Sequence, residues 1–320
     1  MRRAVIIAFA IAFGACTATG ATPTTTTALE TTVTFIEATP PTTAATAPFP
    51  VTIAAANGAV TISAEPHAIV SLSPTATEML FAIGAGGQVV AVDDQSNYPT
   101  NAPITDLTGL NPTVEAIAGY DPDLVVITFD PGDLIDSLDA LGIPVLLDPA
   151  ATSLDDVYTQ IEQLGTATGH ADSAASLTAS MKARIANTYG ETGSADVLTY
   201  YFELDPTYFS VTSSTFIGEI LAPLGLQNIA DPADPDRYGY PQLSSEFIIG
   251  ADPDLILLAD TVCCGQNKDT VAARPAWDSL DAVTKGNIVS LNDDFASRWG
   301  PRVVDLLEAV GAAAREARHQ

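Results

Sequence analysis

Two stretches of the chain repeat one order of polar and apolar positions. Residues 115–127 read EAIAGYDPDLVVI, and residues 246–258 read EFIIGADPDLILL. In each stretch a short apolar segment ends at a glycine, the Asp-Pro-Asp motif is typical of a turn, and an unbroken apolar run follows. Such a run is typical of a strand buried on both faces of a sheet. The pattern therefore predicts a short helix, a turn and a buried strand, twice.

The two short helices carry matching end signals. Thr113 and Ser244 stand where a side-chain hydroxyl can accept one of the first free backbone N–H groups. We expect Gly119 and Gly250 to end the helices in a left-handed conformation, which glycine adopts without a steric penalty. Each copy of the repeat therefore has its own start and stop.

Two further pairs of segments recur in the same order. Residues 78–84 (EMLFAIG) resemble residues 219–225 (EILAPLG), and residues 142–148 loosely match residues 286–292. The glycines at 84–87 follow a predicted helix, which favours a helix cap over a dinucleotide-binding loop. This ordered recurrence predicts two α/β lobes with the same architecture.

Short motifs predict the remaining elements. Asn57-Gly58 lies between two alternating segments, which indicates a β-hairpin over residues 51–62. Ser73-Pro74 and Ser214-Thr215 are typical of helix starts. Further strands are predicted at residues 69–72, 89–92, 124–128, 145–147, 197–202 and 288–291. Trp277 precedes a helical pattern and is predicted to lie in the core.

One long amphipathic helix is predicted between the two copies of the repeat. Leu177, Met181, Ile185 and Tyr189 recur at every fourth position, and residues 172–189 contain no proline or glycine. The helix falls between the lobes in sequence, so we expect it to bridge them. Because a continuous helix is stiff, we expect little hinge closure. The predicted fold class is α/β: two similar α/β lobes bridged by a single long α-helix.

The amino-terminal segment has the features of an export signal. Met1-Arg2-Arg3 is followed by an apolar run over residues 4–15, which is too short to span a bilayer. The run ends in Phe-Gly-Ala-Cys, which resembles a bacterial lipobox and predicts lipidation at Cys16. Cleavage without lipidation and a buried cysteine are the alternatives.

The segment after Cys16 is rich in Thr, Ala and Pro and lacks helical or strand periodicity. It buries too little apolar surface to offset the entropy of ordering, so we interpret it as a tether. The predicted organisation is a signal peptide with the lipidated cysteine at 1–16, the tether at 17–50, an N-terminal lobe at 51–169, the bridging helix at 170–190 and a C-terminal lobe at 191–320.

Composition excludes several function classes. The formal net charge of −27 argues against nucleic-acid binding, which needs clustered Lys and Arg. The histidines His67, His170 and His319 are far apart, and no metal-ligand spacing of His or Cys occurs. We find no Gly-x-Ser-x-Gly motif and no phosphate-binding loop. We therefore predict no metal site, no cofactor and no enzymatic activity.

With these features in place, the chain resembles the substrate-binding proteins of ABC importers of the iron-siderophore/cobalamin class. Residues 69–78 (IVSLSPTATE) match the opening of that family, and residues 294–302 (DFASRWGPR) match a later segment. The resemblance covers about residues 66–318. It implies a ligand cleft between the lobes, attachment to the cell membrane outside the cytoplasm through the lipid anchor, and a monomer.

The resemblance also implies partners. In that family one glutamate on each lobe docks onto the membrane permease, and Glu115 and Glu246 occupy those positions. The partners would be an ABC permease dimer with its ATPase and a metal chelate. A carboxylate in the first turn of a helix is also stabilised by the helix dipole alone, which is the structural alternative.

Candidate ligand-binding residues follow the carboxyl ends of the predicted strands, where open α/β sheets bind ligands. An aromatic-lined cleft with a few polar groups suits a bulky, partly apolar chelate. Core packing is the alternative for each aromatic residue, and pairing with Asp294 is the alternative for Arg298. The candidates are Ser73, Gln95, Phe129, Tyr208, Tyr238, Tyr240, Asp294, Arg298 and Trp299.

If Cys16 is lipidated, Cys263 and Cys264 remain as an adjacent pair in an oxidising compartment. Their Cα atoms are closer than in an ordinary disulfide, so we prefer a rigid turn, with a disulfide as the alternative. The favoured function is capture of a ferric siderophore for an ABC importer. A corrinoid or haem ligand is one alternative, and a surface ligand-sensing protein without transport is another.

Overall fold

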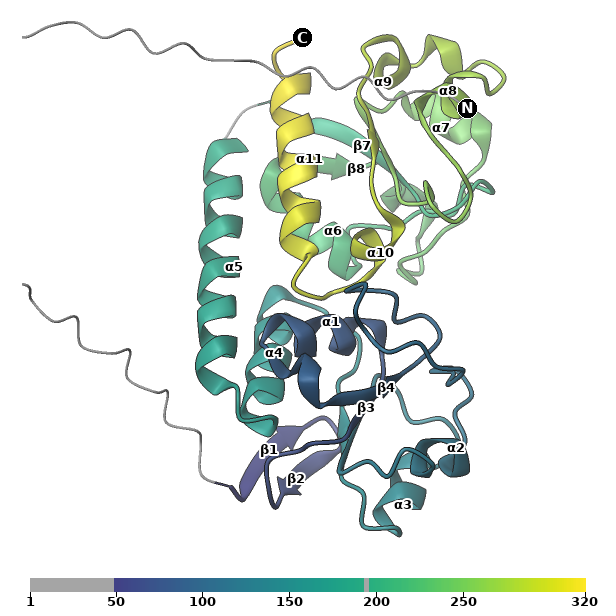
Figure 1. Cartoon of the computed structure of the whole chain (residues 1–320). Helices are drawn as coiled ribbons and strands as arrows, with labels where there is room; N and C mark the ends of the chain where they lie inside the picture. The colour runs from purple at the N-terminus through teal and green to yellow at the C-terminus, as the bar shows by residue number, and fades with distance from the viewer. Residues whose placement is uncertain (1–48, 193–195) are drawn as a thin grey trace, which may run out of the picture. The chain divides into compact units, whose positions relative to one another are not determined.

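The computed structural model describes residues 49–192 and 196–320 (Figure 1). The predicted signal peptide, Cys16 and almost all of the tether lie outside the described residues. No helix in the described part of the chain is long and apolar enough to cross a membrane.

The two lobes contain parallel sheets of identical topology. The N-terminal sheet has the order β4-β3-β5-β6, and the C-terminal sheet has the order β8-β7-β9-β10. In both sheets the strand that comes first in the chain has the second strand on one side and the third and fourth on the other. The strands are β3 Ile69–Leu72, β4 Val89–Val92, β5 Leu124–Ile127, β6 Val145–Leu147, β7 Leu198–Glu203, β8 Leu226–Asn228, β9 Leu255–Leu258 and β10 Ile288–Ser290. The predicted α/β class with two similar lobes is confirmed.

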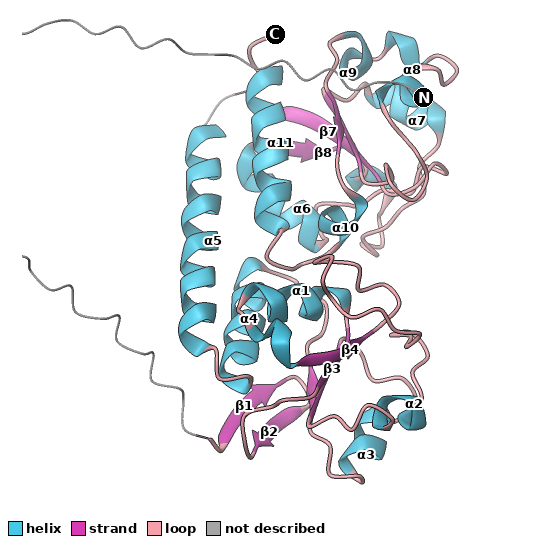
Figure 2. Ribbon diagram, viewed as in Figure 1, coloured by secondary structure: helices cyan, strands magenta, loops and turns pink. Residues whose placement is uncertain are grey.

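Helices surround these sheets, as Figure 2 shows. They are α1 Pro74–Ala82, α2 Val114–Ala118, α3 Leu134–Asp139, α4 Leu154–Ala167, α5 Ala171–Thr192, α6 Phe216–Leu221, α7 Ser245–Ala251, α8 Lys268–Ala272, α9 Asp281–Thr284, α10 Asp293–Ser297 and α11 Val303–Ala317. Short 3₁₀ turns are η1 Ala85–Gln88, η2 Ala222–Leu224, η3 Asp231–Ala233 and η4 Trp277–Ser279.

The repeated helices begin as predicted but end differently. The hydroxyl of Thr113 accepts the N–H of Ala116, and the hydroxyl of Ser244 accepts that of Phe247. The prediction of left-handed glycines was wrong, because Gly119 has a φ of −61° and Gly250 lies inside α7.

The left-handed residue is instead the first aspartate of each Asp-Pro-Asp motif. Asp121 has a φ of 50° and Asp252 a φ of 45°. Aspartate tolerates this conformation better than most residues because its short side chain can form local hydrogen bonds. The Asp252 carboxylate accepts the N–H of Asp281 at 2.8 Å.

The predicted hairpin is present and is fixed to the N-terminal sheet. Strands β1 (Val51–Ala55) and β2 (Gly58–Ile62) pair around Asn57-Gly58. The Asn57 amide donates to Val145 O at 2.9 Å and accepts from Leu147 N at 3.2 Å, both in β6. One turn residue therefore closes the hairpin and docks it.

The long helix α5 bridges the lobes. It packs against α4 in the N-terminal lobe and against α11 and η2 in the C-terminal lobe, and α4 and α11 lie beside it in Figure 1. Met181 and Ile185 of the predicted stripe are buried. The Tyr189 hydroxyl donates to Ile220 O of α6 at 2.8 Å. The predicted bridging role of this helix is confirmed.

Candidate functional site

A cavity of about 290 Å³ lies at the carboxyl edge of the N-terminal sheet. Ser73, Gln95 and Phe129 contribute to its wall from the ends of β3, β4 and β5. Arg298 and Trp299 reach the same cavity from the segment after α10, which belongs to the C-terminal part of the chain. The structure therefore brings these five predicted residues together across more than two hundred positions of sequence.

A larger hollow of about 610 Å³ lies on the other edge of the same lobe. Its lining includes the turn that precedes β5 and the turn that precedes β6, so it faces the amino ends of the strands. Ligands of open α/β sheets bind at the carboxyl ends. We therefore place the candidate site in the smaller cavity.

The apolar part of the cavity wall comes from loops. Phe129 is 43% exposed and Leu110 is 78% exposed, although both are large and apolar. Leu110 was missed by sequence reasoning, because a single leucine in a polar loop gives no periodic signal. A Cβ on the adjacent Gly109 would lie 2.9 Å from Asp93 Oδ2 and 3.0 Å from Leu72 O. Glycine at this position lets the Leu110 loop cross the end of β3 closely.

The Arg298 guanidinium is occupied by protein groups. Its Nη1 donates to Glu78 Oε1 at 2.8 Å and to Asn97 Oδ1 at 2.9 Å. Its Nη2 donates to Gln95 O at 3.1 Å and to Asp294 Oδ1 at 2.8 Å. Asp294, in turn, accepts from the Asn97 amide at 3.1 Å. Arg298 and Asp294 therefore form the ion pair that was the alternative to ligand binding. Their bonds to Glu78, Gln95 and Asn97 join the C-terminal part of the chain to the N-terminal lobe.

Glu78 is the centre of this network and was not singled out from the sequence as a site residue. Its side chain is buried in α1 and also accepts from Arg302 Nε at 2.8 Å and Arg302 Nη2 at 2.5 Å. An ionised carboxylate at this depth needs counter-charges and hydrogen bonds to offset its lost hydration. Two arginines from the far end of the chain provide that pairing.

Trp299 forms a further link between the lobes. Its indole N–H donates to Gln160 Oε1 of α4 at 3.1 Å, and its ring is half-buried against the core. Trp299 therefore lines the cavity from a position that this hydrogen bond and the core contacts fix.

The predicted tyrosines of the C-terminal lobe do not line this cavity. Tyr208 stacks on Trp277 with ring centroids 5.7 Å apart, so it packs against the core, which was the alternative to ligand binding. Trp277 is fully buried, as predicted. Tyr238 and Tyr240 are exposed on the loop between η3 and α7. The buried Asp234 carboxylate holds this loop by accepting from Gly239 N at 2.7 Å.

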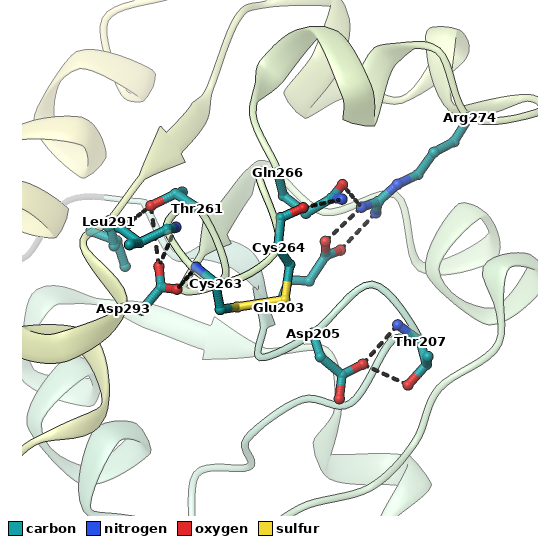
Figure 3. The surroundings of a disulfide bond; sticks show 11 residues. Glu203, Asp205, Thr207, Thr261, Cys263, Cys264, Gln266, Arg274, Leu291 and Asp293 are labelled. Atoms are coloured by element: carbon teal, nitrogen blue, oxygen red, sulfur yellow. Dashed lines mark hydrogen bonds and ion pairs between the residues drawn. A yellow bond between two sulfur atoms is a disulfide. The ribbon is translucent and has the colours of Figure 1, made fainter. Parts of the chain in front are cut away.

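A pair of buried carboxylates, Glu203 and Asp260, lies at the carboxyl edge of the C-terminal sheet, and Figure 3 shows Glu203 facing Arg274. Glu203, at the end of β7, accepts from Arg274 Nη1 at 2.6 Å and Nη2 at 2.5 Å. Asp260, beyond β9, is fully buried, and neither of its oxygens has a hydrogen-bond partner among the described residues. Burial, together with the charge of Glu203, raises the pKa of Asp260 to about 7.

We expect Asp260→Asn to stabilise the protein at high pH. The folded protein keeps the Asp260 proton up to a pKa of about 7, whereas the unfolded chain releases it near 3.8. The unfolded state therefore binds fewer protons between these values, and stability falls as the pH rises. Urea unfolding should give the variant an advantage of about 1–3 kcal/mol at pH 8 that vanishes near pH 4. An equal difference at both pH values would contradict this origin.

The structure joins Cys263 and Cys264 in a disulfide, the alternative that the sequence left open. Both residues are exposed on the loop that follows β9, and Figure 3 shows them beside Asp293. No group of three or more His, Cys, Asp or Glu side chains able to hold a metal occurs within residues 49–192 and 196–320.

Glu115 and Glu246 occupy equivalent places in the two lobes. Each is exposed in the first turn of the helix that precedes the third strand of its sheet. Hydrogen bonds from its own backbone N–H and from Ser244 lower the pKa of Glu246. Neither glutamate forms a salt bridge within the described part of the chain.

Comparisons of the sequence and of the structure with known proteins both find binding proteins. The sequence profile of the family described as periplasmic binding protein matches residues 69–295. An uncharacterized ABC transporter substrate-binding lipoprotein of Bacillus subtilis (strain 168) is 33% identical over 273 residues, which cover 82% of this chain and 84% of the relative. A cobalamin-binding protein of Halobacterium salinarum is 34% identical over 278 residues, which cover 83% of this chain and 74% of the relative.

A solved structure gives the same result for the fold. The periplasmic heme-binding protein of Roseiflexus sp. RS-1 matches with a TM-score of 0.67 and 25% identity, covering 79% of this chain and 99% of that protein. The family match spans both sheets and the bridging helix and includes the strand ends of the N-terminal lobe that line the cavity, whereas Arg298 and Trp299 lie just beyond it. The chain belongs to the periplasmic binding protein family.

Proposed function

We propose that the protein captures a corrinoid-type metal chelate outside the cytoplasm and delivers it to the permease of an ABC importer. The observation that carries the proposal is the cavity between β-strand ends of one lobe and the Arg298 segment, with Phe129 and Leu110 exposed in its wall. Large apolar side chains left exposed in a concave site are typical of ligand binding.

The charges around the cavity favour a chelate without strong negative charge. The cationic side chain in the wall, Arg298, is already bonded to Glu78, Asn97, Gln95 and Asp294. Asp93 and Asp94 add negative charge to the same wall. The carboxylates of haem or of an acidic siderophore would therefore meet no free cation there. Because the wall offers no free cation and the Halobacterium relative is named a cobalamin-binding protein, we favour a corrinoid over the ferric siderophore that the sequence favoured.

The same proposal includes a membrane anchor and a docking surface. Lipidation at Cys16 would hold the exported protein at the membrane, and the segment up to residue 50 would tether the lobes. Glu115 and Glu246 would form salt bridges to basic residues of the permease dimer, one from each lobe. The protein would act as a monomer with its permease and ATPase.

Isothermal titration calorimetry of the purified protein with cyanocobalamin, haemin and ferrichrome tests the ligand. We expect cyanocobalamin to bind with a Kd of about 1 μM or below, and Phe129→Ala to weaken binding about 10- to 100-fold through loss of buried aromatic surface. Tyr120→Ala is the matched control, because Tyr120 is 38% exposed in the same lobe and lies outside the cavity. Failure of all three chelates to bind would overturn the proposed function.

A further inference from the structure

The loop after β9 carries an adjacent cysteine pair at the carboxyl edge of the C-terminal sheet (Figure 3). We propose that Val262, Cys263 and Cys264 form the C-terminal lobe's wall of the ligand site and contact the apolar face of the bound chelate. This inference rests on the proposed function and adds a contact surface to it. The size of the cavity makes such a surface necessary. A bulky chelate exceeds about 290 Å³, so part of it must rest on other residues.

The repeated architecture places this loop at the required edge. Strand β9 is the equivalent of β5, because each is the third strand of its four-stranded sheet in chain order and pairs with the first. The loop after β5 carries Phe129, which lines the cavity. In two sheets of the same topology, the loop after β9 occupies the corresponding position in the C-terminal lobe.

A chain of hydrogen bonds connects the loop to the junction of the lobes. The N–H of Cys263 donates to the Asp293 carboxylate at 2.6 Å. The next residue of α10, Asp294, accepts from the Asn97 amide of the N-terminal lobe at 3.1 Å. Asn97 lies two positions after Gln95, which lines the cavity. The disulfide turn is therefore bonded to Asp293, and the neighbouring Asp294 is bonded to Asn97 at the edge of the site.

The loop combines exposure with apolar character. Val262 is 70% exposed, and both cysteines are exposed. Val262 is one of only a few large hydrophobic side chains that are more than two-thirds exposed in the described part of the chain. An apolar turn left exposed at the ligand edge of a sheet is therefore a candidate contact surface. Sulfur is polarisable and makes favourable contacts with aromatic rings, and the conjugated face of a corrin offers a similar flat, polarisable surface.

The loop is also held rigidly. Asp293 accepts the N–H of Val262 at 2.9 Å as well as that of Cys263. The hydroxyl of Thr261 donates to Leu291 O at 2.5 Å. The disulfide closes a small ring across a single peptide bond, which removes the rotational freedom of both cysteine side chains. A ligand that binds to a preorganised wall loses less affinity to the ordering of protein groups than one that binds to a mobile loop.

The test is cyanocobalamin titration of three variants of the full-length protein. Cys263→Ser combined with Cys264→Ser should raise the Kd about 10-fold, and Val262→Ser should raise it about 5-fold. Val197→Ser is the matched control with an unchanged Kd. Val197 is 64% exposed in the same lobe but precedes β7, at the opposite edge of the sheet. Mass analysis without reductant should show no free thiol at 263 and 264 in the parent protein.

The outcomes separate this inference from the proposed function. If the parent protein binds cyanocobalamin and both loop variants keep its Kd, the inference is overturned and the function stands. If the parent protein binds none of cyanocobalamin, haemin and ferrichrome, the proposed function itself fails. Should the double cysteine variant not fold, Val262→Ser alone decides, because it leaves the disulfide and the backbone hydrogen bonds to Asp293 in place.

Discussion

Replacing Glu78 by glutamine is expected to lower the free energy of unfolding by about 3–5 kcal/mol. The carboxylate is buried in α1 and faces two guanidinium groups, those of Arg298 and Arg302. Glutamine keeps the size of the side chain but removes the negative charge, so both arginines would lose their buried counter-charge. Urea unfolding at neutral pH measures the loss.

Glu219→Gln is the matched control for this substitution. Glu219 is the first residue of segment 219–225, as Glu78 is of the matching segment 78–84, and its side chain is exposed. Its replacement should change the free energy of unfolding by less than about 0.5 kcal/mol. Equal effects of the two substitutions would show that the buried network contributes nothing beyond loss of a surface charge.

The combined substitution Glu115→Ala and Glu246→Ala is expected to abolish uptake of the chelate while its Kd stays unchanged. Both carboxylates are exposed and lie on helices that precede the strands, away from the cavity wall. Loss of both would remove the charge pairs that we propose to orient the protein on the permease, one at each lobe. Uptake of labelled cyanocobalamin by cells or by vesicles that contain the transporter measures the effect.

Asp136→Ala combined with Asp269→Ala provides the control. These aspartates are also exposed in the first turn of a short helix, α3 in one lobe and α8 in the other. Their removal lowers the net negative charge by the same amount, so uptake should be preserved. Transport by the glutamate double variant at the parent rate would reject the docking role of Glu115 and Glu246.

Most of the strands could be predicted because they are short apolar runs, and the central strands are buried on both faces of a parallel sheet. Residues 89–92 and 145–147 are short apolar runs bounded by polar or turn residues, and both became strands at the predicted positions. The repeat made the topology predictable as well, since two copies of helix, turn and strand require two similar sheets. The ends of the repeated helices were not predictable from glycine alone, because Asp121 and Asp252 make the turn.

The partners of buried charges could not be predicted from the sequence. Glu78 and Arg298 are 220 positions apart, and no local pattern links them. One signal was available: Glu78 is the only charged residue in the apolar helix PTATEMLFA, and a lone charge in such a helix needs a buried partner. The same reasoning fails for Glu219, which occupies the matching place in the repeat and is exposed. Burial is decided by what packs against a helix.

The aromatic residues of the site show the same limit. Phe129 and Tyr208 both follow the carboxyl end of a strand, and the sequence treats them alike. In the structure Phe129 is left exposed at the cavity, whereas Tyr208 finds Trp277, which lies 69 positions later. A distant aromatic partner therefore removes a residue from the site without changing its local pattern.

The network around Glu78 also sets the order in which the molecule can mature. Glu78 is synthesised more than two hundred residues before Arg298 and Arg302. Until those arginines emerge from the ribosome, and later from the export channel, helix α1 carries a carboxylate that has no counter-charge from them. The first lobe therefore reaches its final stability only after nearly all of the second lobe has been made, although its own sheet is complete much earlier.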